Sequence, residues 1–365
     1  MCTRRNVNIA LVITNLRGGG AEKAMLRLAT ALANRGNRVR LILLEHRVEH
    51  EIPKDVELHA LTAPGGAIGK GLFGKLNAAF RLRRLYKQLG LGADCLTIST
   101  LPFADQVVSA AKLPNVWYRI ANTLSAEVEA LQQQRKRARR LARYRRLYEG
   151  RSLVAVSNGV ADDLRANLGL QRARIARIYN GFNIEAIRLA ATQPDSEIPN
   201  ESFVLHAARF MPQKRHDLLL DAWRRAALPH RLVLLTQPSA ALNELIASYG
   251  LQDSVFVAGF RANPYPWMRA AELVVLSSDR EGMPNVLVEA LACGTRVVST
   301  DCPSGPREVL RGELARWLVP CRDPQALADA MKKSLAEPRP NASTLPIEFT
   351  EAHMAAAYEA LATSV

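Results

Sequence analysis

The chain of 365 residues is 48% hydrophobic and 23% charged, which is typical of a globular protein and long enough for two domains of ordinary size. Its five cysteines are odd in number and form no C-x-x-C pair, so they argue against a disulfide framework or a zinc knuckle and for a reducing compartment. No run approaches the ~18 uninterrupted apolar residues of a membrane-spanning helix, and the first apolar run is too short for a signal peptide.

The net charge of +15 is unevenly distributed along the chain. Residues 1–180 carry the whole positive excess, and the remainder is slightly negative. A cationic first half indicates an anionic partner, and nucleic acid, a membrane surface or a phosphate-bearing substrate would each meet that requirement.

Short β-branched or leucine-rich runs alternate with helical stretches from end to end. In the first half we predict strands over residues 8–14, 38–44, 56–61, 95–99, 116–120, 152–157 and 175–179, with helices between most of them, for example over 21–35 and 103–112. The alternation starts again with strands over 203–208, 231–236, 255–258, 273–277 and 296–300. Apolar strands alternating with helices predict parallel sheets that are covered on both faces.

This pattern predicts an α/β protein of two Rossmann-like, doubly wound parallel-sheet domains that face each other across a cleft. We expect the first domain over residues 1–190 and the second over 203–345, joined by the polar linker 191–202. We also expect a helix over about 350–362 to pack back onto the first domain.

The first predicted strand is followed by NLRGGGAEK, in which Gly18, Gly19 and Gly20 lead into a helix. A glycine-rich turn between a strand and a helix exposes backbone N–H groups and the positive helix end, where a phosphate can bind. The segment is not a G-x-G-x-x-G motif. The alternative is a tight turn that simply tolerates glycine.

The segment HAARFMPQKRHD repeats the strand–loop–helix arrangement at the start of the second half. Arg209 follows the strand and Lys214 opens the helix, so both cations can converge on a diphosphate beside a helix N-terminus. The alternative is that both side chains are solvated.

The segment EGMPNVLVEALACG, residues 281–294, predicts a short helix that is buried on all sides although it contains Glu289. Glu281 lies just before this helix, in the loop after a buried strand. A buried carboxylate is costly unless it is hydrogen-bonded, and its two acceptor oxygens suit a vicinal diol such as ribose. The alternative is that Glu289 pairs with a buried Arg or with backbone amides.

EGMPNVLVE resembles the E-x7-E motif of the retaining GT-B glycosyltransferases of family 4. Other segments lie in the order along the chain that is typical of that family. They are the glycine loop, Arg209, Lys214 and GFRANPYPWMRAAELVVLSS before the motif, and ALACGTRVVSTDCPSGPREVL at its end. The likeness spans essentially the whole chain and is strongest over residues 203–310. It is closest to members that build bacterial surface polysaccharides and lipid-linked glycans.

The resemblance implies a role for each of these residues. Glu281 would contact the transferred sugar, and Glu289 would hold the ribose of the nucleotide. Arg209 and Lys214 would neutralise the diphosphate leaving group, while the helix start would add backbone amides and the loop at Phe260 would lie against the base. The full set of expected contacts is Gly18, Gly19, Gly20, Arg209, Lys214, Phe260, Arg261, Glu281, Gly282, Met283, Pro284, Asn285, Val286 and Glu289.

Two segments depart from the family pattern. LLTQPSAAL has no glycine where many members have a glycine-rich turn after the second strand of this domain. YRIANTLS has Asn122 and Thr123 where many members have a His in the first domain, so no His role is carried over.

Two basic amphipathic stretches bear on the acceptor. QQQRKRARRLARYRRLYEGR has eight Lys and Arg between Arg135 and Arg146, and residues 71–90, GLFGKLNAAFRLRRLYKQLG, form the second. Each cation near an anionic leaflet contributes ~1 kcal/mol, so together they predict contact with an anionic membrane surface. A solvated helix face is the alternative.

The sequence therefore predicts a retaining glycosyltransferase that needs no metal or cofactor and moves a sugar from a nucleotide-sugar to a glycan or polyprenyl-linked acceptor. We expect a UDP-sugar donor, with UDP-N-acetylhexosamine or UDP-galactose ahead of GDP-mannose. We expect the protein to be cytoplasmic and peripheral on the inner face of the cytoplasmic membrane. The alternatives are a GT-B sugar-nucleotide epimerase, which would have no use for the basic stretches, and a nucleic-acid-binding protein, which would need aromatic residues among its cations.

Overall fold

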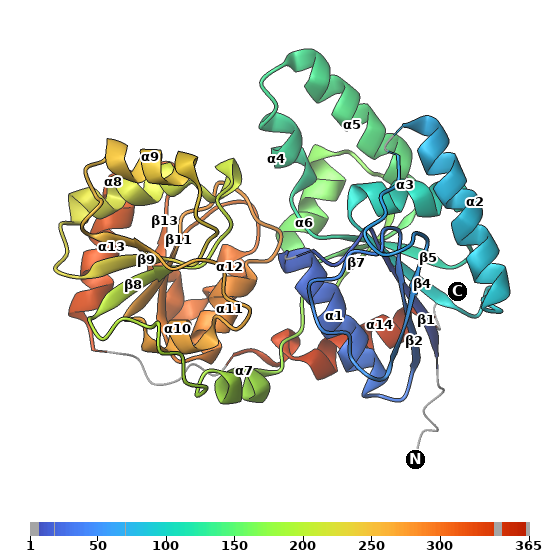
Figure 1. Ribbon diagram of the computed structural model, residues 1–365. Helices are drawn as coiled ribbons and strands as arrows, with labels where there is room; N and C mark the ends of the chain where they lie inside the picture. Colours follow the sequence, from blue (N-terminus) through green and yellow to red (C-terminus); the bar gives the residue numbers. More distant parts are fainter. Residues whose placement is uncertain (1–6, 18, 70, 339–344, 363–365) are drawn as a thin grey trace. The chain divides into compact units, whose positions relative to one another are not determined.

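The computed structural model describes residues 7–17, 19–69, 71–338 and 345–362 of the chain, and it divides into two compact units (Figure 1). Unit 1 comprises Met1–Gly181 and Ile347–Val365, and unit 2 comprises Phe182–Pro346. Each unit is a parallel sheet with helices packed against it, so the prediction of two doubly wound α/β domains is confirmed.

Unit 1 contains a seven-stranded parallel sheet with the order β3-β2-β1-β4-β5-β6-β7. Its strands are β1 (Asn8–Ile13), β2 (Arg38–Leu43), β3 (Val56–Ala60), β4 (Leu96–Thr100), β5 (Val116–Ile120), β6 (Ser152–Ala155) and β7 (Arg174–Arg177). Its helices are α1 (Gly20–Ala33), α2 (Leu72–Gln88), α3 (Pro102–Ala111), α4 (Leu124–Glu129), α5 (Gln134–Tyr148), α6 (Asn158–Asp162) and α14 (Glu351–Ala362). A π turn (Asp163–Asn167) follows α6, and a 3-10 turn (Ile347–Phe349) precedes α14.

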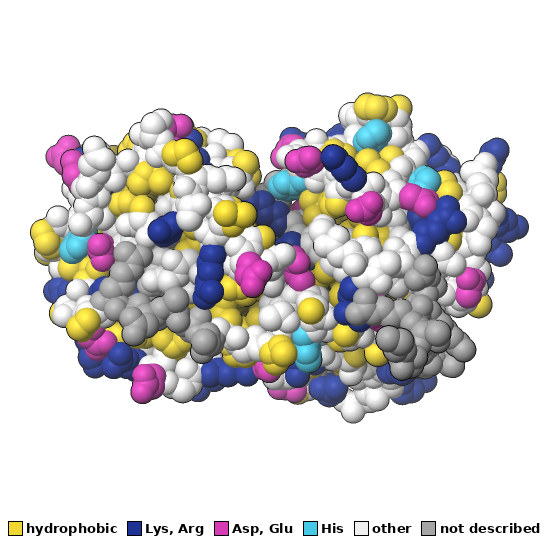
Figure 2. All heavy atoms as spheres, turned by 90° about the horizontal axis from the view of Figure 1, so that it is seen from below, with side chains coloured by type: hydrophobic (Ala, Val, Ile, Leu, Met, Phe, Trp, Pro, Cys, Tyr) yellow, Lys and Arg dark blue, Asp and Glu magenta, His cyan; other side chains and the backbone are white. Residues whose placement is uncertain are grey.

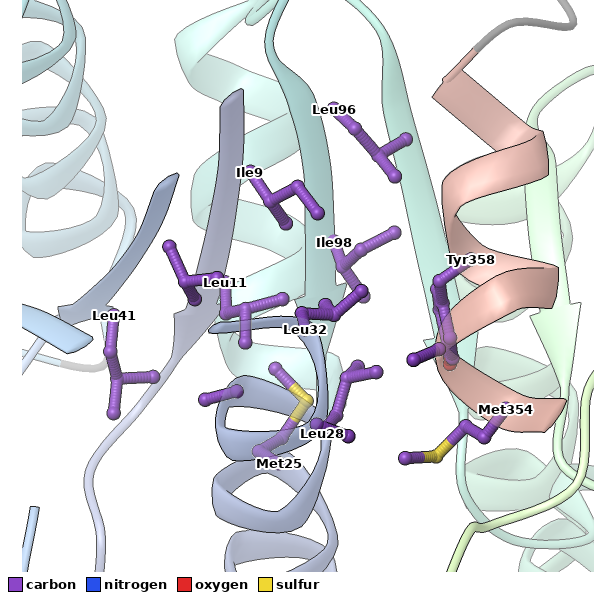
Figure 3. Packing of buried hydrophobic residues seen from close by; sticks show 14 of the residues in the cluster. Ile9, Leu11, Met25, Leu28, Leu32, Leu41, Leu96, Ile98, Met354 and Tyr358 are labelled. Atoms are coloured by element: carbon purple, nitrogen blue, oxygen red, sulfur yellow. The ribbon is translucent and has the colours of Figure 1, made fainter. Parts of the chain in front are cut away.

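The core of unit 1 lies between the sheet and the helices α1 and α14. Met25, Leu28 and Leu32 recur at three- and four-residue intervals, so they form one apolar stripe on α1 that packs on the sheet. Figure 3 shows side chains of β1, α1, β4 and α14 meeting in this cluster. Burying such side chains stabilises the fold by about 25 cal/mol per Å² of apolar surface.

The helix α14 belongs to unit 1 although it lies at the far end of the sequence. Met354 and Tyr358 are buried in the core of unit 1. A Cβ atom on Gly181 would lie 2.7 Å from the Cα of Glu351, so only glycine permits this close approach of the two chain segments. The segment at Gly181, where the chain leaves unit 1, therefore packs against the start of α14, where the chain has returned to it.

Unit 2 contains a six-stranded parallel sheet with the order β10-β9-β8-β11-β12-β13. Its strands are β8 (Phe203–His206), β9 (Arg231–Leu234), β10 (Val255–Val257), β11 (Leu273–Leu276), β12 (Arg296–Thr300) and β13 (Leu318–Val319). Its helices are α7 (Ile184–Ala190), α8 (His216–Ala226), α9 (Ala240–Ser248), α10 (Tyr265–Ala270), α11 (Asn285–Ala292), α12 (Pro306–Val309) and α13 (Pro324–Ala336), with 3-10 turns at Pro212–Lys214 and Gly312–Trp317.

The boundary between the units lies earlier than the sequence predicts. Unit 1 ends at Gly181 rather than at residue 190, so α7 is part of unit 2, where Arg188 Nε donates to the carbonyl of Ala292 across 3.2 Å. The predicted linker 191–202 also lies inside unit 2, where Asp195 accepts a 2.7 Å hydrogen bond from the indole of Trp267. Its polar composition is that of a linker, but its side chains anchor it to α10.

In each sheet the strand order reverses direction at one place. In unit 1 the reversal lies between β1 and β4, and in unit 2 it lies between β8 and β11. The loops that leave two such strands at their carboxyl ends run to opposite sides of the sheet, and a ligand can bind between them. In unit 2 these loops are residues 207–215 and 277–284, which contain six of the predicted site residues, Lys214 and Glu281 among them.

Candidate active site

The two loops at the switch point of unit 2 are joined by hydrogen bonds. The Ser277 hydroxyl donates to the carbonyl of Lys214 across 2.8 Å. The Gln213 amide donates to the carbonyl of Arg280 across 2.8 Å, and the backbone N–H of Asp279 donates to the carbonyl of Gln213 across 3.0 Å. Side chains on the two loops are therefore held close to one another.

At the centre of these loops Lys214 and Glu281 form an ion pair, with Nζ 2.6 Å from Oε1. The Ser278 hydroxyl donates to the same carboxylate oxygen across 2.6 Å. Glu281 is 7% exposed, and a carboxylate at this depth requires such charged and neutral donors. Sequence reasoning brought Lys214 and Glu281 to one site but did not identify Ser278, because nothing in the sequence indicates the direction of its hydroxyl.

The loop after β12 supports Glu281 from the other side. The backbone N–H of Glu281 donates to the carbonyl of Pro303 across 2.9 Å, and the N–H of Ser304 donates to the carbonyl of Glu281 across 3.0 Å. Gly305 follows with φ +101°, and a Cβ atom there would lie 2.6 Å from Cδ of Pro284. Only glycine fits, because both the left-handed backbone and the close approach exclude a side chain.

The residue after Lys214 anchors the loop. Arg215 has φ +50°, and its guanidinium donates to Asp217 and, with Nη1 3.0 Å from Oδ1, to Asp279. The hydrogen bond to Asp217 and the contacts with Asp279 raise the pKa of Arg215 above its ordinary value. The sequence predicts that Lys214 opens the helix, but Lys214 instead ends the 3-10 turn, and α8 begins at His216.

Two buried histidines lie behind this loop, with ring centroids 4.8 Å apart. His206 donates from Nδ1 to the carbonyl of Val275 across 2.9 Å, and burial lowers its pKa to about 4. Burial also lowers the pKa of His216 to about 3, and neither of its ring nitrogens has a hydrogen-bond partner among the described residues. Both rings are therefore neutral near pH 7.

The helix α11 begins directly after Pro284, and no side chain caps its N-terminus in the described structure. Glu289 is 9% exposed on this helix, and Asn285 lies one turn earlier. Gly282, Met283 and Pro284 are buried, whereas Asn285 and Val286 are half-buried. The prediction of a helix buried around a carboxylate is confirmed.

Of the remaining predicted residues of unit 2, Arg209 lies in the same loop as Lys214, and Phe260 and Arg261 lie in the loop after β10. Arg209 is exposed and leaves the end of β8. Phe260 is 44% exposed, whereas Arg261 pairs with Glu197 across 2.5 Å and lies over the ring of Trp267. The hydrogen bond that Arg261 donates to Glu197 raises the pKa of Arg261, so this guanidinium is already held by the protein.

The predicted residues of unit 1 lie at its own switch point. Gly18 lies outside the described residues. Gly19 is buried before the first turn of α1 and Gly20 is the first residue of that helix. In the segment that departs from the family pattern, Asn122 accepts a 2.9 Å hydrogen bond from the backbone of Thr123, at the start of α4.

Arg119 at the end of β5 is a buried cation that sequence reasoning missed. Its guanidinium donates to Asn180 across 2.6 Å and to Thr100 across 3.3 Å, and burial lowers its pKa. Its partners connect β4, β5 and the segment that leaves unit 1. An Arg inside an apolar strand is the only signal in the sequence.

The two basic stretches form exposed helices of unit 1. On α5 the side chains of residues 134–139 are all exposed, including Ala138, and only Tyr144, Leu147 and Tyr148 are buried at its end. On α2 the apolar residues Leu72, Phe73, Leu76 and Phe80 are exposed, Phe73 by 87%. On the face drawn in Figure 2, cationic side chains of both units are interspersed with acidic ones.

No cluster of three or more metal-ligating side chains is present in the described ranges. None of the helices in this part of the chain combines the length and the apolar composition that crossing a membrane requires.

Comparison with protein families and known proteins agrees with this geometry. Residues 18–186 match Glycosyltransferase Family 4, and residues 201–337 match Glycosyl transferases group 1. An N-acetylgalactosamine-N,N'-diacetylbacillosaminyl-diphospho-undecaprenol 4-alpha-N-acetylgalactosaminyltransferase of Campylobacter jejuni is 27% identical over 345 residues, which are 90% of each chain.

Solved structures show the same fold. A sucrose-phosphate synthase from Thermosynechococcus elongatus superposes with a TM-score of 0.72 at 18% identity, over 98% of this chain and 94% of that one. Anabaena Alr3699/HepE in complex with UDP and glucose superposes with a TM-score of 0.68 at 19% identity, over 98% and 95%. The expected GT-B architecture is thereby confirmed.

Proposed function

Because the chain belongs to the glycosyltransferases that combine a family 4 domain with a group 1 domain, we propose that it transfers a sugar from a UDP-sugar to a lipid-linked glycan with retention of configuration. The observation that carries this proposal is the Lys214–Glu281 pair at the switch point of unit 2. A cation for a diphosphate and a carboxylate for a sugar hydroxyl lie there in direct contact.

The donor binds to unit 2. Lys214 carries its charge next to the position of the diphosphate, and the exposed Arg209 supplies the second cation. Charge that develops on the departing nucleotide is stabilised by these two groups, so the reaction requires no metal. Gly282 and the backbone N–H groups of Met283, Asn285 and Val286, at the start of α11, add hydrogen bonds to phosphate oxygens.

The two carboxylates have different roles. Glu281 contacts the transferred sugar, because Lys214 and Ser278 hold its carboxylate in one orientation beside the diphosphate. Glu289 accepts the two ribose hydroxyls, because each of its two carboxylate oxygens can accept one hydrogen bond of a vicinal diol. The base lies against Phe260 and the backbone of Arg261, since the Arg261 guanidinium is held by Glu197.

The acceptor binds to unit 1, with its phosphate groups near the glycine loop. Two observations support a lipid-linked acceptor. The Campylobacter relative acts on a glycan attached to diphospho-undecaprenol and aligns with 90% of this chain. The cations of α5 and the apolar residues exposed on α2 are suited to an anionic membrane surface. The enzyme therefore works at the inner face of the cytoplasmic membrane as a peripheral protein.

A thermal-shift screen of UDP, GDP and ADP tests the donor assignment. A ligand that binds only the folded state stabilises it in proportion to ln(1 + [L]/Kd), so UDP should raise the Tm most. Incubation of UDP-N-acetylhexosamines and UDP-galactose with a polyprenyl-diphosphate glycan, followed by NMR of the product, then reads out the sugar and its anomeric configuration. A larger shift with GDP would refute the UDP assignment, and an inverted product would refute retention.

The sugar-nucleotide epimerase remains the second candidate, because it would use the same donor site. It differs in needing no acceptor. If UDP is released only when the acceptor is present, the epimerase is excluded. If the UDP-sugar is converted to its epimer in buffer alone, the transferase proposal is wrong.

A further inference from the structure

Two cysteines follow neighbouring strands beside the candidate active site. β12 and β13 pair in parallel, with Ser299 opposite Leu318 and Thr300 opposite Val319. The ladder extends by one more hydrogen bond, 2.8 Å long, from the N–H of Asp301 to the carbonyl of Val319. Cys302 and Cys321 each lie two residues beyond the last paired residue of their strand, and Cys321 lies in a turn.

The paired strand ends bring the two cysteines into the same region. Paired strands lie about 4.7–4.9 Å apart and disulfides span Cα separations of roughly 4.4–6.8 Å, so a small movement of the segments beyond the strand ends is enough to join the two thiols. A charge on Cys321 raises the pKa of Cys302, which also indicates that the two thiols are close. Both cysteines are free thiols in the structure.

We propose that Cys302 and Cys321 form a reversible disulfide, and that this bond controls the candidate active site through the loop 301–305. Cys302 precedes Pro303 and Ser304, whose backbone groups hold Glu281 at 2.9 and 3.0 Å. The existence of the disulfide is independent of the proposed function, whereas its effect on turnover rests on it.

Oxidation requires an external disulfide, such as glutathione disulfide, and begins at Cys321. This thiol is half-buried, whereas Cys302 is 3% exposed. The Cys321 thiolate attacks one sulfur of glutathione disulfide, breaks its S–S bond and releases one glutathione. Cys302 then loses its proton and attacks the Cys321 sulfur of the mixed disulfide, releasing the second glutathione. Two protein thiols are oxidised and one glutathione disulfide is reduced to two thiols.

The surroundings make this reaction slow near neutral pH. Burial raises the pKa of both thiols, so the thiolate fraction is small and increases as the pH rises. The charged or titratable groups that act on Cys302 are Glu281, Cys321 and Lys214, and those that act on Cys321 are Asp279, Asp301, Arg322 and Arg215. The site therefore responds to sustained oxidation rather than to brief pulses.

The disulfide should lower turnover because it pulls on the backbone that supports Glu281. The Cys302 side chain must approach Cys321 to bond, and Pro303 follows it directly. A displacement of about 1 Å at a reacting group can cost roughly 100-fold in rate, so we expect at least a several-fold loss of turnover that a dithiol reductant restores.

The test incubates the full-length protein with glutathione disulfide at pH 8.5, blocks free thiols and maps the peptides by mass spectrometry. The expected product is a Cys302–Cys321 cross-link that disappears on reduction. Cys321→Ser should retain basal turnover and lose its sensitivity to the oxidant. Cys293→Ser is the matched control, because Cys293 is also half-buried but lies at the end of α11, and it should remain sensitive.

A stable glutathione adduct on Cys321 without the cross-link would overturn the proposal, as would a cross-link that involves Cys95 or Cys293. A cross-link in a protein that transfers no sugar in either redox state would leave the disulfide standing and refute the proposed function. Sugar transfer without any cross-link would refute the disulfide and leave the proposed function standing.

Discussion

Lys214 donates a 2.6 Å hydrogen bond to Glu281, so the cation assigned to the diphosphate is paired with the carboxylate assigned to the sugar. The pair is largely shielded from water, with side-chain exposures of 22% for Lys214 and 9% for Glu281. Each residue therefore partly neutralises the charge that the other presents to the nucleotide-sugar. This coupling leads to expectations that independent roles would not produce.

Replacing Glu281 by Ala should lower turnover by about 100-fold, the scale of losing one stabilising group in a transition state. It should leave UDP affinity unchanged or increase it, because Lys214 is then no longer neutralised and UDP lacks the sugar. Glu289→Gln, which weakens the ribose contact, should instead reduce UDP affinity. Steady-state kinetics and calorimetric titration with UDP measure both effects. Equal losses of UDP binding in the two variants would contradict the division of roles.

The two cations should differ in their effect on stability. Lys214→Ala and Arg209→Ala should each lower turnover by about 100-fold or more, and EDTA should have no effect on the native enzyme. Only Lys214→Ala should also lower the Tm, because it leaves the buried Glu281 without its charged partner, which costs about 1–3 kcal/mol or more. Arg209 is exposed and serves as the matched control. Loss of activity with EDTA would mean that a metal stabilises the leaving group.

Acid should destabilise unit 2 through its buried histidines. The folded pKa values of His206 and His216, about 4 and about 3, lie below the unfolded value of ~6.5. The unfolded chain therefore takes up protons first, and stability present above pH ~6.5 is lost as the pH falls towards 4. His216→Phe should show a smaller fall in Tm than the native protein between pH 6.5 and 4.5.

The comparison with His216→Phe is needed because Asp105 in unit 1 changes the stability with pH in the opposite direction. Burial raises the pKa of Asp105 to about 7, so this group favours the folded state increasingly as the pH falls from 7. Asp105 is unchanged in His216→Phe and its contribution cancels. Identical pH profiles for the native protein and the variant would show that His216 contributes nothing to acid sensitivity.

Much of this architecture could be predicted from the sequence because apolar runs and helical periodicity are local properties. Every predicted strand is present, and among the residues that the structure describes only β13 was missed, since two residues are too few to form a pattern. The unit boundary was misplaced because composition does not reveal that Arg188 and Asp195 bond within unit 2. Ser278 and Arg119 were missed for the same reason, since their importance depends on which distant residues the fold brings to them.

The apolar residues exposed on α2 predict membrane binding that salt does not abolish. Phe73 and Phe80 are 87% and 69% exposed, and inserting each ring into the interface removes apolar surface from water. Replacing either by Ser should weaken binding to anionic vesicles by about tenfold at both low and high salt. Leu189→Ser is a matched control, because Leu189 is 72% exposed in unit 2. Unchanged sedimentation of both Phe variants would mean that α2 does not insert.

The cations of α5 should contribute the salt-dependent part of the same binding. Four exposed arginines on α5 are spaced so that they form one stripe along the helix: Arg135, Arg139, Arg143 and Arg146. Replacing them by Gln should remove roughly 4 kcal/mol of attraction, at ~1 kcal/mol for each charge, and should release the protein from anionic vesicles near physiological salt. The attraction is screened over about 8–10 Å at that ionic strength, so the native protein should bind more weakly as salt rises.

An equal loss of charge at Arg224, Arg225, Arg231 and Arg316 of unit 2 is the control and should leave the protein bound. UDP affinity should be the same in all three proteins, because the donor site belongs to unit 2. If the α5 variant retains its vesicle binding but loses UDP, then α5 belongs to the donor site and the roles assigned to the two units are reversed.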